Sequence, residues 1–449
     1  MRAHVKVRFR QDDSTLAAVM ADAGGQGASV GGRSTLEVAP AMSPRDEATF
    51  LLHTAAEIEH ALMVQYLYAA WSLAPQAPMA VQRWRRDILQ VAREEMAHFA
   101  SVQNLLRFVG GPLNFDREDF PFRSEFYPFP LRLEPLGRVS LARYVAAEMP
   151  AEPGIDPELL TTVRALATGA ANGQPVNRVG ALYNRLTTLL ADQHRLPDSL
   201  LRPDSAATIQ APPARYRADA GQGPLFLRVV ASRDQALSLL NDVASQGEGE
   251  DSILDSHFLT FVEIFDNWPT ADRDAHSLEV PTDANTTPSG VERDDADLST
   301  GRITHPHART WAWIFNHHYR MLLAWLQHAL LTPPKAATSA GLSLRTFAEM
   351  LVLSEVGQLL TTLPRTAEGM GRAGATFELP YSLAFPDLPA DRWDYQRDLV
   401  SSARGQLDAL DASTGPTEDA VRRRLLGSIR AAERFVAAAT QPPSAEHPV

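Results

Sequence analysis

A glutamate and a histidine stand three residues apart, at Glu95 and His98, inside a stripe of large apolar side chains. Residues spaced by threes and fours share one face of a helix, so both polar side chains would point into a protein core. Burying them is costly unless a partner takes up their charge or lone pairs. A metal ion suits the pair, because Glu-x-x-His helps to build dinuclear iron and manganese sites in helical bundles. The stripe consists of Trp84, Ile88, Val91, Glu95, His98, Val102, Leu105 and Val109.

A second stripe upstream carries a matching carboxylate. Glu59 repeats with Leu52, Ala55, Leu62, Tyr66, Ala69 and Leu73 in the same rhythm. The neighbouring acid Glu57 falls on another helix face, so the register favours Glu59 as the inward ligand. Tyr66 lies two turns beyond Glu59, and we predict that it assists catalysis from beside the metal ligands.

An ordinary structural interpretation competes with the metal. An inward histidine is often a hydrogen-bonded core residue, and an inward glutamate often pairs with an arginine such as Arg85, Arg86 or Arg93. Two stripes with three inward ligand-type residues favour the metal interpretation.

The remaining ligands should come from a later pair of helices. Glu248 continues a stripe through Leu237, Leu240 and Ala244, and His257 begins one through Phe261, Ile264 and Trp268. We therefore predict Glu248 and His257 as further metal ligands. A second Glu-x-x-His would need an acid three residues before His257, where Leu254 stands, and Glu250 or Glu263 are the alternatives for that role.

The elements that must position these residues are helices. A proline-rich turn at residues 75–78 separates helices expected at residues 46–74 and 79–109, and glycines 110 and 111 end the second helix. We predict an all-α fold: a four-helix bundle over residues 46–268, preceded by a peripheral N-terminal segment over residues 1–45 with one short strand. The other expected bundle helices cover residues 140–148, 179–192, 233–245 and 254–265.

Two further regions follow the bundle. Residues 269–309 are acidic and rich in threonine, proline and serine, which predicts an extended connector. Residues 310–449 contain further amphipathic stretches, which predict additional C-terminal helices. These two regions contain His305, His307, His317 and His318. No acid lies at helical spacing from His317, and His305 and His307 are expected in a loop, so we interpret these histidines as surface or core residues.

Composition narrows the function classes. The chain has 449 residues, 45% of them hydrophobic, and no cysteine, so any metal must use nitrogen and oxygen ligands, which favours iron or manganese. The net charge of -12 argues against a nucleic-acid partner. No apolar run approaches the ~20 residues of a membrane span, and residues 1–9 lack a signal-peptide core, so we expect a cytoplasmic protein. Its charge and helical faces permit a homodimer.

Four segments resemble a bacterial ferritin-like family that includes the iminophenyl-pyruvate dimer synthases of violacein and rebeccamycin-type pigment pathways. They are Ala56–Ala69, Glu94–Phe99 with Gly110–Pro112, Gln246–Gly249, and Ser256–Ile264. The resemblance spans roughly residues 47 to 268. It implies a ferritin-like bundle with non-haem iron, in which Glu59, Glu95 and His98 match the general ligand pattern and Glu248 and His257 match later motifs of the family.

These inferences predict a non-haem iron oxidoreductase with one or two iron ions. Dioxygen and a small aromatic or amino-acid-derived metabolite, the latter implied by the resemblance alone, would be its substrates. Two other classes stay open: an iron-storage protein and a non-catalytic helical scaffold.

Overall fold

The chain forms two compact units, residues 1–283 and 284–449, and the boundary lies inside the predicted 269–309 connector. The computed structural model is mostly helical, as predicted, and no strand occurs in the part of the chain that it describes. That part comprises residues 42–117, 120, 131–150, 152–168, 179–208, 210, 228–248, 256–269, 276–287, 300–381, 383, 385–410 and 415–441, without the side chains of residues 179–181, 208, 247 and 248. The predicted N-terminal strand lies outside it.

Two long antiparallel helices form the centre of the first unit, and they occupy the predicted ranges closely. They are α3 (Pro44–Ser72) and α4 (Met79–Val109). Ser43 caps α3 by accepting a hydrogen bond from the Asp46 amide at 3.2 Å, as N-cap serines do. Gly110 ends α4 at a φ of 76°, a left-handed conformation that suits glycine. The Arg45 side chain donates to the Val109 and Gly110 carbonyls, which joins the start of α3 to the end of α4.

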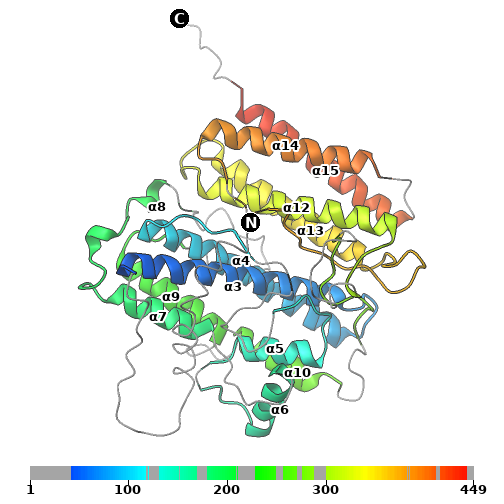
Figure 1. Ribbon diagram of the computed structural model, residues 1–449, viewed down its shortest axis with the longest axis horizontal. Helices are drawn as coiled ribbons and strands as arrows, with labels where there is room; N and C mark the ends of the chain where they lie inside the picture. The colour runs from blue at the N-terminus through cyan, green and yellow to red at the C-terminus, as the bar shows by residue number, and fades with distance from the viewer. Residues whose placement is uncertain are drawn as a thin grey trace, which may run out of the picture. The chain divides into compact units, whose positions relative to one another are not determined.

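Shorter helices pack around this pair in two sets. One set is α5 (Arg138–Ala147) with α10 (His257–Asn267), and the other is α7 (Val179–Ala191) with α9 (Arg233–Glu248). Figure 1 shows α7 and α9 beside one end of α3, and α5 and α10 beside its other end. Helix α7 contacts α3, whereas α9 and α10 both contact α4. Helices α7 and α5 therefore take the place of one long bundle helix beside α3, and α9 and α10 take the place of another beside α4. The ends of these shorter helices meet near the middle of α3 and α4.

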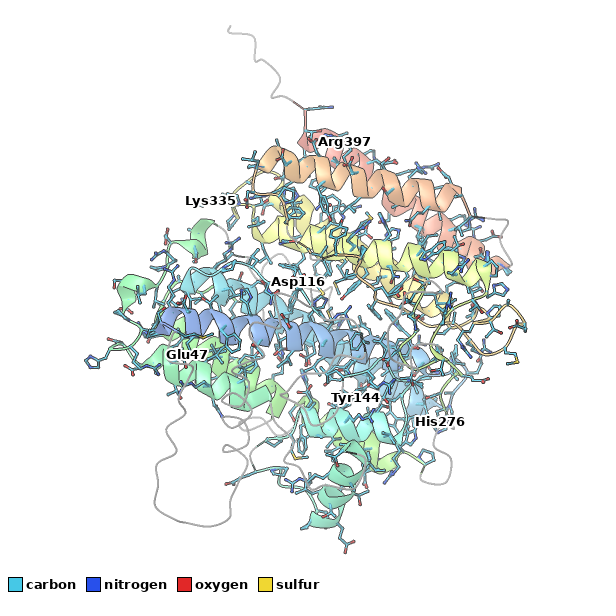
Figure 2. All side chains as sticks on the ribbon, viewed as in Figure 1. Glu47, Asp116, Tyr144, His276, Lys335 and Arg397 are labelled. Carbon is cyan, nitrogen blue, oxygen red and sulfur yellow. The ribbon has the colours of Figure 1, made fainter. Side chains whose placement is uncertain are left out.

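Charged contacts fasten the shorter helices to the long ones. Glu47, labelled in Figure 2 near the start of α3, is buried and accepts hydrogen bonds from Arg185 of α7 at 2.9 Å and from Arg195 at 2.7 Å. Two partners offset the desolvation of this carboxylate, which would otherwise be costly. The unit also contains α6 (Pro157–Thr168), which packs on α5, α8 (Ser205–Thr208), which contacts α4, and the short 3-10 helix η2 (Asp198–Leu200).

The second unit is also helical. Its helices are α12 (Pro306–Leu330), α13 (Ser339–Leu360), α14 (Pro389–Asp408) and α15 (Pro416–Ala439), with α12 packed on α13 and α14, and α15 packed on α13 and α14. The histidines noted in the sequence have partners here. His318 pairs with Glu349 of α13 at 2.7 Å, and His307 contacts Glu418 of α15 at 3.0 Å. Among the helices that the structure describes, none has an apolar stretch long enough to cross a membrane.

Candidate metal centre

Five buried ligand-type side chains converge in the middle of the first unit. They form two groups that share one residue: Glu59, Glu95 and His98 in the first, and Glu95, Glu148 and His257 in the second. Within each group, one potential ligand atom from every residue lies within 4.8 Å of the others. The predicted residues Glu59, Glu95, His98 and His257 are thus brought together. Glu148 was not predicted.

The five side chains reach this point from four helices. Glu59 comes from α3, and Glu95 and His98 come from α4, where a spacing of three places them on one face. Glu148 is the C-cap residue of α5, and His257 is the first residue of α10. Glu148 and His257 are therefore positioned by helix ends. This is possible because short helices replace one long helix on two sides of the bundle.

The Nδ1 atoms of both histidines face the carboxylates. His98 Nδ1 lies 3.4 Å from Glu59 Oε2 and 3.6 Å from Glu95 Oε2. His257 Nδ1 lies 2.7 Å from Glu95 Oε1 and 3.8 Å from Glu148 Oε2. Glu95 therefore presents one oxygen to each histidine, so it could serve as a ligand in both groups.

The outer nitrogen of each histidine contacts an oxygen acceptor. His98 Nε2 lies 2.7 Å from the Gln246 side-chain oxygen on α9, and His257 Nε2 lies 3.0 Å from Glu94 Oε2 on α4. An oxygen acceptor requires the Nε2 atom to carry a proton, so in the neutral form of each imidazole the Nδ1 lone pair would face inward and could bind a metal. Outer contacts of this kind orient histidine ligands in metal sites.

Two buried tyrosines donate hydrogen bonds to Glu59 and Glu148, the terminal carboxylates, which each belong to only one of the two groups. The Tyr66 hydroxyl donates to Glu148 Oε1, and the Tyr183 hydroxyl donates to Glu59 Oε1. Tyr66 is therefore adjacent to the ligand-type residues, as the sequence predicted, although its partner is Glu148 rather than Glu59. Tyr183, on α7, was missed.

The residues fit a metal in two respects. Glu59 Oε2 and His257 Nδ1 are buried and have no hydrogen-bond partner among the described residues, although other polar atoms lie close to both. Atoms that approach each other without hydrogen-bond alignment are what a shared cation would explain. The ligand set also contains only carboxylate and imidazole donors, which suit iron and manganese.

Protonation of the metal-free site reflects the crowding of these charges. Burial and the adjacent Glu95 raise the pKa of Glu59 to about 8. Burial alone would lower the pKa of His98, but its contacts with Glu59 and Glu95 outweigh burial and raise that pKa to about 10. The pKa of His257 is raised well above its usual value for the same reason, through Glu95, Glu148 and Glu94. Without a cation, protons held by Glu59 and by the two histidines therefore offset the negative charge of the site.

The remaining predicted ligand positions have different outcomes. The Glu248 side chain lies outside the described residues, as does Glu250, so the part of each in the site stays a prediction. Glu263, the other alternative for the missing acid, is wrong, because its half-exposed side chain pairs with Arg83 on the surface. Glu148 was detectable in principle. It ends an apolar stripe through Leu141, Tyr144 and Val145, the same signal that revealed Glu95.

The fold and the site together define a ferritin-like bundle. Residues 52–266 match the protein-family model described as Ferritin-like, close to the range of 47–268 that the resemblance predicted. These residues therefore form a ferritin-like domain, and the predicted family relationship and fold class are confirmed.

Two curated proteins are similar to this chain over different lengths. Dichlorochromopyrrolate synthase of Lentzea aerocolonigenes is 28% identical over 400 residues, which cover 77% of this chain and 37% of that protein. The 2-imino-3-(indol-3-yl)propanoate dimerase of Chromobacterium violaceum is 30% identical over 161 residues, which cover 27% of this chain and 16% of that protein. The alignments thus span about a third of the first relative and less of the second.

A solved structure also matches. It is a ferritin-like protein from Caulobacter vibrioides, with 18% sequence identity and a TM-score of 0.42, over 70% of this chain and 96% of that one.

Proposed function

We propose that the first unit holds two iron ions between Glu59, Glu95, His98, Glu148 and His257, and that the protein is a non-haem iron oxidoreductase. The observation that carries the proposal is the pair of buried ligand groups sharing Glu95. A scaffold would have no need to bury three carboxylates and two imidazoles with two of their polar atoms unpartnered. Two divalent ions would supply the positive charge that three ionised carboxylates require.

Iron is the metal that best combines these donors with oxidative chemistry. The described site offers only oxygen and nitrogen ligands, and the chain has no cysteine for softer metals. Bound iron would supply one-electron redox chemistry and coordination positions for dioxygen.

The residues around the ligands orient them and exclude water. The Tyr66 ring packs against the rings of Tyr144 and Phe261, with centroids 5.0 and 4.8 Å away. All three side chains are buried, and together they form an aromatic wall beside Glu148, in the part of the unit where Figure 2 labels Tyr144. Such a wall lowers the local polarity and strengthens the electrostatic hold on a cation.

The substrate class is suggested by the two curated relatives. Their names describe a chromopyrrolate synthase and a dimerase of an indole-bearing imino acid. We therefore propose that dioxygen and a small aromatic or amino-acid-derived metabolite are the substrates, and that the protein acts in the cytoplasm in secondary metabolism. Because the chain covers only part of each relative, their complete reactions are not transferred to it.

Metal analysis of the full chain, produced with ample iron, tests this function. We expect two iron ions per chain, with spectroscopic evidence of magnetic coupling between them, and loss of both after Glu95→Ala. Glu263→Ala, which removes a surface carboxylate from α10, should keep both ions. Circular dichroism should establish that each variant remains folded.

The two other classes give different results. A scaffold would contain no iron, and its unfolding free energy would change little in Glu95→Ala. A storage protein would take up many iron ions per chain, well beyond the number of ligand groups. Either result would contradict the proposed enzyme.

A further inference from the structure

The two histidines of the candidate centre differ in what contacts their outer nitrogens. His98 donates from Nε2 to the neutral amide oxygen of Gln246, whereas His257 donates from Nε2 to a carboxylate oxygen of Glu94. The other contacts of the two groups are closely matched, since each terminal glutamate accepts a tyrosine hydroxyl and both groups share Glu95. The outer partner is therefore the main chemical difference between the two metal positions.

Glu94 is held firmly in this role. Its side chain is 13% exposed, and its second oxygen accepts a hydrogen bond from Gln90 one turn earlier on α4. Two N–H donors to one carboxylate favour its ionised form and fix its orientation. A negative charge is thus fixed against the imidazole of His257, and among the described side chains the Nε2 atom of His98 has no such charged partner.

From this difference we propose that the two positions are unequal, with the Glu148–His257 position binding its ion first and more tightly. This inference rests on the proposed function, because it assumes that both positions hold metal. An anionic hydrogen-bond acceptor makes an imidazole a stronger donor and holds its ring in place, and loss of such a contact typically costs 10–100-fold in metal affinity. Glu94 is then a positioning residue that acts through His257 and never touches the ion.

The shared Glu95 adds a second reason for ordered binding. Once one ion is bound, its positive charge repels a second ion nearby, so the better-supported position fills first. The protein would then have a defined one-metal form with the ion beside His257, and the position beside His98 would stay open until the metal concentration rises.

Titration of the metal-free full chain with Mn(II) alone tests the proposal. We expect one tight and one weaker binding step by calorimetry, and a mononuclear Mn(II) signal by electron paramagnetic resonance after the first equivalent. His257→Ala should remove the tight step, and His98→Ala should remove the weaker one. These two variants assign each step to a position.

Two substitutions, each of which gives one histidine the type of outer partner that the other has, then provide the decisive comparison. Glu94→Gln should weaken the tight step roughly 10-fold or more and bring the two steps together. Gln246→Glu should strengthen the weaker step. Glu94→Asp keeps the charge and should retain part of the tight step, and Glu263→Gln, a change of surface charge on α10, should alter neither step.

The outcomes separate this inference from the proposed function. Two ions bound with equal affinity by the unaltered protein, or a tight step that Glu94→Gln leaves unchanged, would overturn the inference and leave the two-metal site standing. If Glu94→Gln does not fold, Gln246→Glu decides, since an unchanged weaker step would contradict the proposal. Absence of any stoichiometric binding would overturn both.

Discussion

The Tyr66 hydroxyl on α3 donates a hydrogen bond to Glu148, which stands 82 residues later at the end of α5. Both side chains are buried, so the bond connects two elements inside the core of the first unit. Tyr183 repeats the arrangement with Glu59. Each terminal carboxylate of the candidate centre therefore has one oxygen held by a phenol and the other directed toward a histidine.

Tyr66→Phe should weaken metal binding at the Glu148–His257 position by roughly 10-fold, because it removes a hydrogen bond that orients a ligand. Tyr183→Phe should act in the same way at the Glu59–His98 position. Calorimetric titration with Mn(II) would measure both effects. Tyr68→Phe serves as the control, because the Tyr68 hydroxyl donates to the Pro281 carbonyl rather than to a ligand-type residue. Equal effects of all three substitutions would argue against a role for the phenols at the site.

Glu148→Ala should lower the iron content from two ions to one per chain, since it removes a ligand from one group and leaves Glu59, Glu95 and His98 complete. Glu248→Ala tests the acid that the sequence favoured for this part of the site. We expect Glu248→Ala to keep both ions, because Glu148 already completes the second group. Elemental analysis of the two purified variants would decide between the two glutamates, and loss of iron in Glu248→Ala alone would reverse our assignment.

The central helices and their ligands could be predicted because the relevant signal is local. Apolar residues at spacings of three and four define α3 and α4, and the same spacing places Glu59, Glu95 and His98 on their inward faces. The outer partners could not be found in this way. Gln246 and Tyr183 reach the site through packing between helices that are far apart in the chain, and no local spacing records such a contact.

Two helices have weak sequence signals for related reasons. Helix α14 is rich in charged residues and buries only Gln396, Leu399, Val400, Ala403 and Leu407, so its apolar stripe is weak. Helix α6 is short and buries only Val163 and Ala167. Such helices owe their stability mainly to packing against neighbours, which sequence periodicity does not reveal.

Metal affinity should rise with pH between about pH 6.5 and 8. In the metal-free protein, the pKa of Glu59 is raised to about 8 and that of His98 to about 10, so both groups hold protons near neutral pH. A cation must displace these protons. Below the pKa of a group, each proton displaced makes the metal affinity rise about tenfold for every unit by which the pH increases. Calorimetry in buffers of different ionisation enthalpy should therefore detect proton release, and Glu59→Gln should release fewer protons per ion. Binding that neither releases protons nor varies with pH would contradict this account of the site.

The second unit should lose stability in acid because of two histidines on α12. Burial lowers the pKa of His317 to about 4, despite the opposing hydrogen bond to the Leu399 carbonyl, and burial lowers that of His328 to about 3. Both values lie below the 6.5 of an unfolded chain, so between pH 6.5 and 4 the unfolded state binds protons that the folded state does not. The contribution of His317 is thus fully present above pH 6.5 and is lost as the pH falls toward 4, by about 3 kcal/mol at most.

Hydrogen exchange measured on peptides from α12 and α14 would assign this loss to the second unit. The exchange rates of these peptides report local opening of the two helices separately from the first unit. His317→Gln keeps a donor for the Leu399 carbonyl and an acceptor for Arg320, but it does not titrate. In His317→Gln, we expect the protection of α12 against hydrogen exchange to fall less steeply between pH 6.5 and 4.5 than in the unaltered protein. His194→Gln, at an exposed position in the first unit, should leave the pH dependence of α12 unchanged. If His317→Gln loses protection as steeply as the unaltered chain, protonation of His317 does not cause the acid sensitivity, because the substituted side chain has no titrating group to supply it.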